Sequence, residues 1–165
     1  VLHERDWFIR MFGDYEQDDK TNNNDEQYDI TFIPDRRSLL NQFVKDLRLA
    51  KSEVNLIISG LEVPAEIILE NKRAIERGVK FRLLIQQDDI SDIKMFHHWQ
   101  DMGINIKSMT SINVRILLVD SQVTYILTQN PKQLTQSIGI RIAYSPINFV
   151  MKQVFDMYWE KGLLA

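Results

Sequence analysis

The stretch from Glu53 to Gln86, EVNLIISGLEVPAEIILENKRAIERGVKFRLLIQ, decides the fold class. Its two ends are rich in Val, Ile, Leu and Phe, which is typical of buried strands, and Gly60 ends the first of them. Between the two ends, Pro64 marks a first helical turn, apolar residues follow at helical spacing, and Gly78 ends the helix. The stretch therefore predicts a strand–helix–strand unit with two parallel strands in one sheet.

The same alternation continues on both sides of this unit. We expect strands at 28–33, 104–107, 114–119, 122–127 and 138–144, and helices at 36–51, between Asp92 and Gly103, and at 146–162. Asp120 and Ser121 form a two-residue turn between two of these strands, which predicts a hairpin. The sequence thus predicts an α/β fold with a mixed, largely parallel sheet flanked by helices.

Composition excludes several classes of protein. With 165 residues, 44% hydrophobic, the chain has the size and apolar content of one folded domain. It has no cysteine, which excludes disulfides, thiolate metal sites and cysteine nucleophiles and fits a cytoplasmic protein. No apolar run is long enough to span a membrane, and the first residues do not resemble a signal peptide. We expect no metal, no cofactor and no membrane partner.

The N-terminal part differs from the rest in charge and pattern. Residues 1–13 contain Trp7, Phe8 and Met11 at helical spacing, which predicts a short helix. It is either the tail of an upstream helix, and so a connection to an upstream domain, or a helix that packs on this domain or on its copy. Residues 14–27 hold six acidic residues and one lysine, which predicts a flexible acidic linker. Because the sequence starts with Val rather than Met, we expect a fragment of a longer chain, with its folded domain at 28–165.

Two polar clusters are interpreted as ordinary surface. His97 and His98 are adjacent on a predicted helix, so they point about 100° apart and cannot chelate one ion together. We expect one of them to be exposed and the other half-buried. Lys45 and Arg48 belong to a basic face of the first long helix, which Asp46 interrupts. Without interleaved aromatic residues, this face is interpreted as solvated rather than as a nucleic-acid site.

The residues NVRILLVD at 113–120, followed by LTQN at 127–130, carry the most informative pattern. They resemble the signature of the phospholipase D superfamily, H-x-K-x4-D-x6-G-S-x-N, with the spacing kept at every position. The residues at the six positions are Asn113, Arg115, Asp120, Leu127, Thr128 and Asn130. Asp120 and Asn130 keep the family residue, and the strand–turn–strand context is similar to that of the family.

The resemblance implies a catalytically inactive domain. In active members of the family the His attacks phosphorus, the Lys and Asn hold phosphate oxygens, and two motifs combine. This chain has one motif, and Asn113 stands at the position of the His. An asparagine side chain can neither attack phosphorus nor exchange a proton near neutral pH. We therefore expect no catalytic residue.

Two further segments extend the resemblance to non-catalytic members. Residues 74–84 resemble the helix, R-G-V-K, strand step of this fold, and residues 154–161 resemble its F-x-x-x-W-x-K ending. Such endings occur in the effector-binding domains of TrmB-like archaeal transcription regulators and in some sensor histidine kinases. The resemblance covers about 28–165. It implies a homodimeric sensor domain joined to a DNA-binding or kinase module outside these residues.

Several alternatives stay open. By the resemblance, a small polar or anionic ligand would bind at Asn113, Arg115, Asp120, Thr128 and Asn130, since amide, guanidinium and hydroxyl groups donate hydrogen bonds to such ligands. The same residues also suit a plain hairpin in which Arg115 balances Asp120 across the turn, or a pure dimerisation module. The alternative function is a phosphodiesterase or nuclease of the phospholipase D superfamily with a non-standard nucleophile.

Overall fold

The structure is a computed structural model that describes residues 28–59, 63–86, 93–110, 114–128 and 138–164. The predicted N-terminal helix at 1–13 and the predicted linker at 14–27 lie outside the described residues. The elements are, in chain order, β1 (Asp29–Ile33), α2 (Arg36–Leu49), β2 (Glu53–Ile58), α3 (Ala65–Glu76), β3 (Lys80–Gln86), α4 (Ile93–Asp101), β4 (Asn105–Met109), β5 (Val114–Val119), β6 (Val123–Thr128), β7 (Ile138–Ala143), α5 (Ser145–Lys161) and β8 (Leu163–Leu164).

Local sequence signals set the ends of several helices. The carboxylate of Asp35 accepts a hydrogen bond from the backbone N–H of Ser38 at 2.7 Å, which caps the first turn of α2. Pro146 lies in the first turn of α5, where its missing N–H costs nothing. Gly78 and Gly103 follow α3 and α4 with φ of +92° and +95°, a conformation that favours glycine. These stops agree with the predicted ones.

The described strands form one eight-stranded sheet in the order β1-β7-β6-β5-β2-β3-β4-β8. Only the pairs β2–β3 and β3–β4 are parallel, while the other five pairs are antiparallel. The mixed α/β fold is therefore confirmed, but the expectation of a largely parallel sheet is wrong. Helical crossovers join only β2, β3 and β4 to their neighbours in the sheet. The strands β5, β6 and β7 follow one another without a helix and pair antiparallel.

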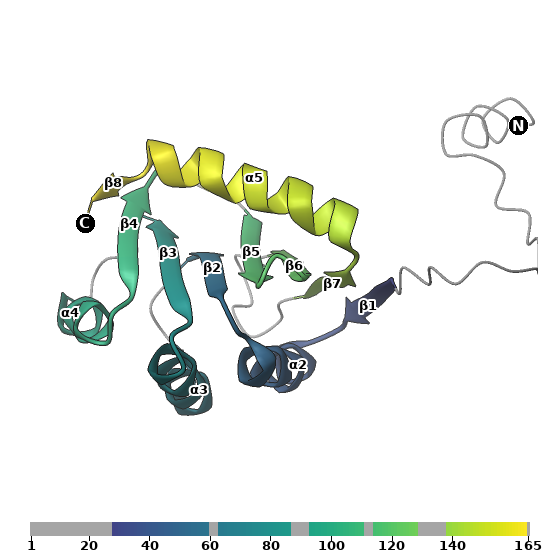
Figure 1. Cartoon of the computed structure of the whole chain (residues 1–165), viewed down its shortest axis with the longest axis horizontal. Coiled ribbons are helices and arrows are strands. Elements are labelled where there is room, and N and C mark those ends of the chain that lie inside the picture. The colour runs from purple at the N-terminus through teal and green to yellow at the C-terminus, as the bar shows by residue number, and fades with distance from the viewer. Residues whose placement is uncertain (1–27, 60–62, 87–92, 111–113, 129–137, 165) are drawn as a thin grey trace, which may run out of the picture.

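Helices cover both faces of the sheet (Figure 1). α2, α3 and α4 lie on one face, and α5 alone runs across the other. The two faces alternate along β2, where Val54 and Leu56 belong to the core under α2 and α3 and Ile57 packs with Phe155 of α5. None of the described helices is long and apolar enough to cross a membrane.

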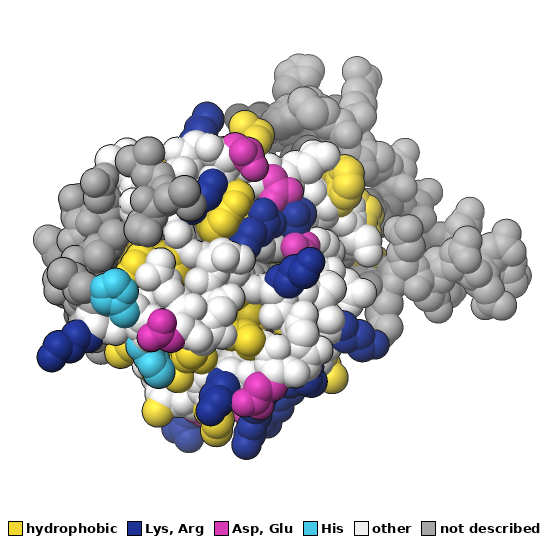
Figure 2. Space-filling view, turned by 60° about the vertical axis from the view of Figure 1, so that its left-hand side comes forward, with side chains coloured by type: hydrophobic (Ala, Val, Ile, Leu, Met, Phe, Trp, Pro, Cys, Tyr) yellow, Lys and Arg dark blue, Asp and Glu magenta, His cyan; other side chains and the backbone are white. Residues whose placement is uncertain are grey.

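Both histidines of α4 stand on the surface (Figure 2). The prediction that one of them is half-buried is wrong. Phe96 and Trp99, three residues apart, are the side chains that α4 buries. His97 and His98 lie between them and are therefore turned toward solvent. Among the described residues, no group of three or more His, Asp or Glu side chains is placed to hold a metal ion.

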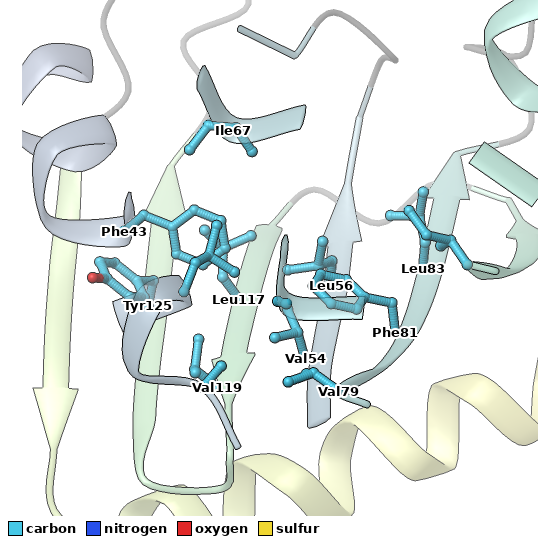
Figure 3. Close-up of a cluster of buried hydrophobic side chains, with 14 of the residues drawn as sticks. Phe43, Val54, Leu56, Ile67, Val79, Phe81, Leu83, Leu117, Val119 and Tyr125 are labelled. Atoms are coloured by element: carbon cyan, nitrogen blue, oxygen red, sulfur yellow. The ribbon is translucent and has the colours of Figure 1, made fainter. Parts of the chain in front are cut away.

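The larger core lies between the sheet and the layer of α2, α3 and α4. In the close-up of Figure 3, Phe43 of α2 lies beside Tyr125 of β6, and the two rings meet edge to face with centroids 5.6 Å apart. Such pairs stabilise a core by about 0.5–1.5 kcal/mol beyond the area they bury. This packing fixes α2 over the hairpin that carries the family motif.

A buried ion pair ties α2 to the antiparallel half of the sheet. The guanidinium of Arg141 in β7 donates two hydrogen bonds of 2.8 Å to the carboxylate of Asp46, which also accepts one from the hydroxyl of Tyr125. All three side chains are buried. Burial and the neighbouring carboxylate raise the pKa of Tyr125, so its hydroxyl stays protonated. Asp46, which looked like an interruption of a basic face, is thus a buried structural residue.

Candidate functional site

Those residues of the resembled motif that the structure describes lie on the β5–β6 hairpin, as the spacing predicts. Val119 pairs with Val123, and Asp120 and Ser121 form the turn with φ of 54° and 53°. Two successive residues with positive φ are typical of the type I′ turn that suits the twist of a hairpin. The hairpin and its two-residue turn are confirmed.

Asp120 fastens the closed end of the hairpin to the connection between α2 and β2. Its carboxylate accepts hydrogen bonds from the backbone N–H groups of Lys51 at 2.7 Å, Ser52 at 2.8 Å and Glu53 at 3.0 Å. The hydroxyl of Ser52 donates another at 2.8 Å, and the N–H of Asp120 itself donates to the carbonyl of Glu53 at 2.8 Å. The protein itself thus supplies the hydrogen-bond donors for the carboxylate of Asp120, without a ligand.

The pKa of Asp120 reflects these contacts. Partial burial of the carboxylate on its own raises its pKa. The hydrogen bonds from the backbone N–H groups of Glu53, Ser52 and Lys51 outweigh burial and hold the pKa below its usual value. Asp120 is therefore ionised across the physiological range.

The described motif positions other than Asp120 lie toward the opposite end of the hairpin. Arg115 pairs with Leu127, and Val114 with Thr128. Five residues of extended strand separate Arg115 from Asp120, which is about 16 Å. A small ligand cannot contact both residues. The structure therefore does not bring Asp120 together with Arg115 and Thr128, and the interpretation that Arg115 balances Asp120 across the turn is wrong.

The open end of the hairpin lies at one end of the strands of the sheet, where the parallel strands β2, β3 and β4 also end. Ile58 pairs with Ile85, Gln86 pairs with Met109, and Ile57 pairs with Ile116, so these strand ends are level. This end of the strands is termed the open edge. It is made by the strand ends Ile58, Gln86, Met109, Val114, Thr128 and Ile138.

Arg115 is the cationic residue of the motif at the open edge. Its side chain is half-buried, and its Nε donates a hydrogen bond of 3.0 Å to the hydroxyl of Ser59, directly after β2. Its Nη2 lies 3.5 Å from the carbonyl oxygen of the same residue. The contact fixes the guanidinium at the carboxyl end of β2. An anion at this edge would meet a fixed positive charge.

Thr128 lies at the same edge but faces the other way. Its hydroxyl donates to the carbonyl of Ile138 at 3.1 Å, and its side chain is exposed. Opposite residues of an antiparallel pair share a face, so Thr128 shares one with Val114 and Arg115 shares the other with Leu127. The predicted residues Asn113 and Asn130 lie outside the described residues.

Ser59 is the partner that sequence reasoning missed. It is the first polar residue after the apolar run of β2, and it stands immediately before Gly60. Polar side chains at the carboxyl ends of parallel strands commonly form binding sites in α/β sheets. That rule, applied to Glu53–Ser59, would have placed Ser59 at the open edge.

Comparison with known proteins bears on the fold. No family profile matches the sequence, and no curated protein matches it significantly. Among solved structures, NucT from Helicobacter pylori has a TM-score of 0.71 at 11% identity over 84% of this chain and 100% of its own. Nuc from Salmonella typhimurium, a phospholipase D family member, has a TM-score of 0.69 at 14% identity over 82% of this chain and 97% of its own.

TrmBL2, an archaeal chromatin protein whose structure shows a novel mode of DNA binding, is also similar. Its TM-score is 0.67 at 12% identity, and the match covers 99% of this chain. This chain spans 62% of the length of the TrmBL2 chain, which is less than two thirds. The described strands and helices, together with these three likenesses, show that the chain has a phospholipase D-like fold that is related to that of TrmB-like proteins.

Proposed function

We propose that this domain is a non-catalytic regulatory domain that binds a small polar or anionic ligand at the open edge. The observation that carries the proposal is the Arg115–Ser59 pair, which fixes a guanidinium at an edge where Asn113 replaces the nucleophile of the family motif. We propose that Asn113 and Asn130 complete the ligand site, whereas Thr128 lies at the same edge on the opposite face of the sheet. Asp120 serves the site only indirectly, by fixing the turn of the hairpin.

The described histidines do not support catalysis at this edge. His97 and His98 belong to α4, beside β4 (Figure 1). In the sheet order, β4 is three strand positions from β5. At about 4.8 Å per strand this is about 14 Å, too far for a histidine to replace the nucleophile next to Arg115. A fixed cation with neither of the described histidines beside it favours binding over turnover.

The output of the domain is proposed from the likeness to TrmBL2. That protein binds DNA, and this chain matches 62% of its length. We therefore place any contact with DNA in a domain outside these residues and propose a cytoplasmic, homodimeric part of an archaeal transcription regulator. The residues before Tyr28 would connect the two parts. A sensor kinase is the other output that fits the same domain.

A thermal-shift screen tests ligand binding directly. The probes are inorganic phosphate, sugar phosphates, nucleotides and free sugars, added to the full chain. A ligand at 100 times its dissociation constant stabilises the folded state by about 2.7 kcal/mol. For a domain of this size the melting temperature then rises by roughly 5–10 °C. We expect such a rise with at least one class of probe, and its loss in Arg115→Ala.

Lys80→Ala is the matched control, because Lys80 is an exposed cationic residue at the start of β3, where it pairs with Glu53 at the end of the strands opposite the open edge. It should keep the full response to the ligand. A response that survives Arg115→Ala would place the ligand elsewhere. The absence of any response across the four classes of probe would favour a pure dimerisation module.

The alternative function is a phosphodiesterase or nuclease with a non-standard nucleophile. The likeness to Nuc, which covers 97% of that chain, supports it. It requires a group that attacks phosphorus next to Arg115. It therefore predicts turnover of an activated phosphodiester, whereas the regulatory proposal predicts none.

A further inference from the structure

An apolar surface lies uncovered at the β1 end of the sheet. Ile30 and Phe32 point to the face that carries α5, because Thr31 between them stands opposite Arg141, which reaches Asp46 on the other face. Their side chains are 58% and 63% exposed, although both residues lie within a strand. Isolated exposed apolar residues are common, but a contiguous group of them marks an interaction site.

Other exposed apolar side chains extend this group. Ile138 at the start of β7 is 45% exposed, and Tyr28 directly before β1 is 65% exposed. Tyr28 is two residues from Ile30, and Ile138 is two residues from Ile140, which pairs with Phe32, so both share the face of Ile30 and Phe32. This group is termed the β1 surface. It consists of Tyr28, Ile30, Phe32 and Ile138.

β1 is also an edge strand. In the part of the chain that the structure describes, β7 is the sole strand that pairs with β1. Proteins usually protect such an edge with outward charges, a proline or a bulge. β1 has no proline, pairs with β7 without a break in register, and carries one charged residue, Asp29, which is bound to Arg141 at 3.2 Å. The outer side of β1 can therefore pair with a strand of another chain.

We propose that the β1 surface joins two copies of this chain through antiparallel pairing of β1 with β1 of the second copy. A two-fold axis at Thr31 gives a register that uses the whole strand. Thr31 then faces Thr31 of the second copy, and Ile30 faces Phe32 of the second copy. Threonine pairs and aliphatic–aromatic pairs are among the favourable cross-strand pairs. The symmetry is the isologous type that most homodimers have.

Charge and area both suit a second copy of this chain. In this register Asp29 faces Ile33 of the second copy, so the two Asp29 residues stand four positions apart, about 13 Å. The aromatic and aliphatic side chains of the β1 surface offer on the order of 500 Å² of exposed apolar area per copy. A standard interface takes about 800 Å² from each partner, of which roughly 60% is apolar.

Sedimentation velocity of the full chain tests this surface. We expect the wild type to sediment at twice the chain mass of 19.5 kDa. Ile30→Lys and Phe32→Lys should sediment at the single-chain mass, because each symmetric interface would then bury two unpaired ammonium groups. Both positions are exposed, so the circular dichroism spectrum should stay unchanged. Leu49→Lys is the matched control, since Leu49 is an exposed leucine at the end of α2, and it should stay dimeric.

Cysteine cross-linking tests the register. The chain has no cysteine, so Thr31→Cys introduces a single thiol. Opposite residues of an antiparallel pair have Cα atoms about 4.5–5.5 Å apart, which suits a disulfide. Thr31→Cys should therefore form a covalent dimer on oxidation. Tyr28→Cys should not, because in this register the two copies of position 28 stand about 20 Å apart along the strands.

The inference rests on the homodimer of the proposed function but not on its ligand, so the two fail separately. A wild type that sediments at 19.5 kDa overturns the inference and leaves residues 1–27 as the candidate cover of the β1 surface. If the wild type is a dimer that Thr31→Cys does not cross-link, or that both lysine variants leave intact, the β1 surface is not the interface. The homodimer of the proposed function then still stands. Ligand stabilisation in a monomeric variant would leave the proposed sensing role standing.

Discussion

The two ends of the β5–β6 hairpin differ in the hydrogen bonds that their polar side chains make. At the closed end, the carboxylate of Asp120 accepts four hydrogen bonds from Lys51, Ser52 and Glu53. At the open end, the guanidinium of Arg115 is fixed through Ser59, and Thr128 donates one hydrogen bond to a carbonyl group. The same motif thus supplies a structural clamp at one end and a candidate binding group at the other.

Residues of one sequence motif therefore need not share one site. Asp120 and Arg115 stand at two positions of the motif that the chain resembles, yet about 16 Å of strand separates them. Stability should therefore depend mainly on the closed end, and ligand binding mainly on the open end. The predictions below test this division.

The largest effect on stability is expected at the closed end. Asp120→Ala removes the acceptor of three backbone N–H groups and a hydroxyl. It also places alanine at a φ of 54°, which aspartate tolerates better. We expect the free energy of unfolding in urea to fall by about 2–3 kcal/mol. A loss below about 0.5 kcal/mol would contradict the clamp.

A smaller effect depends on pH. The folded-state pKa of Asp120 lies below its usual value, so the carboxylate stabilises the fold above the pKa of about 3.9 that it has when unfolded. This contribution is lost as pH falls through the folded-state pKa. Asp120→Asn keeps an acceptor but no charge. The difference in unfolding free energy between wild type and Asp120→Asn should therefore be largest above about pH 5 and shrink toward pH 3.

The other acidic residues with lowered pKa values provide the internal control. Glu70 and Asp156 have their pKa values lowered by arginine and lysine partners, and both are present in wild type and variant. The unfolding free energy that these residues lose in acid is the same in both proteins, so it cancels in the difference between wild type and Asp120→Asn. A difference that stays constant between pH 5 and pH 3 would show that the charge of Asp120 does not stabilise the turn.

The smallest effect on stability is expected at the open end. Arg115→Ala and Ser59→Ala each remove one side of a half-buried hydrogen bond. We expect each to lower the unfolding free energy by about 1 kcal/mol or less. Arg115→Ala should nevertheless abolish the ligand-induced rise in melting temperature. If it destabilises the fold as much as Asp120→Ala does, the open end is structural as well.

The fold was largely predictable because its signals are local. Glycine stops, helical periodicity and the turn at Asp120–Ser121 are local features, and the structure has the predicted elements there. Strand direction depends on which strands become neighbours. Because β1, α2 and β2 follow one another in the chain, the sequence favours β1 and β2 as neighbours. In the sheet, however, β7, β6 and β5 lie between them. Adjacency of this kind depends on contacts between residues far apart in the chain.

The candidate site was predictable only in part, for the same reason. Asp46 and Arg141 are 95 residues apart, and no local pattern distinguishes their buried pair from exposed charges. Asp120 was placed in the site because it belongs to the motif, whereas its partners come from the α2–β2 connection nearly 70 residues away. Arg115 was identified by the motif spacing, and its partner Ser59 emerged when β2 and β5 were seen side by side.

If the open edge binds a phosphate-containing ligand without cleaving it, the protein should not hydrolyse an activated phosphodiester. Wild-type protein is incubated with bis(p-nitrophenyl) phosphate, and the release of p-nitrophenolate is followed against a buffer blank. The regulatory account predicts no release above the blank, because Asn113 cannot attack phosphorus. Release that is lost in both Arg115→Ala and Asn130→Ala would contradict this account and would identify the domain as a phosphodiesterase.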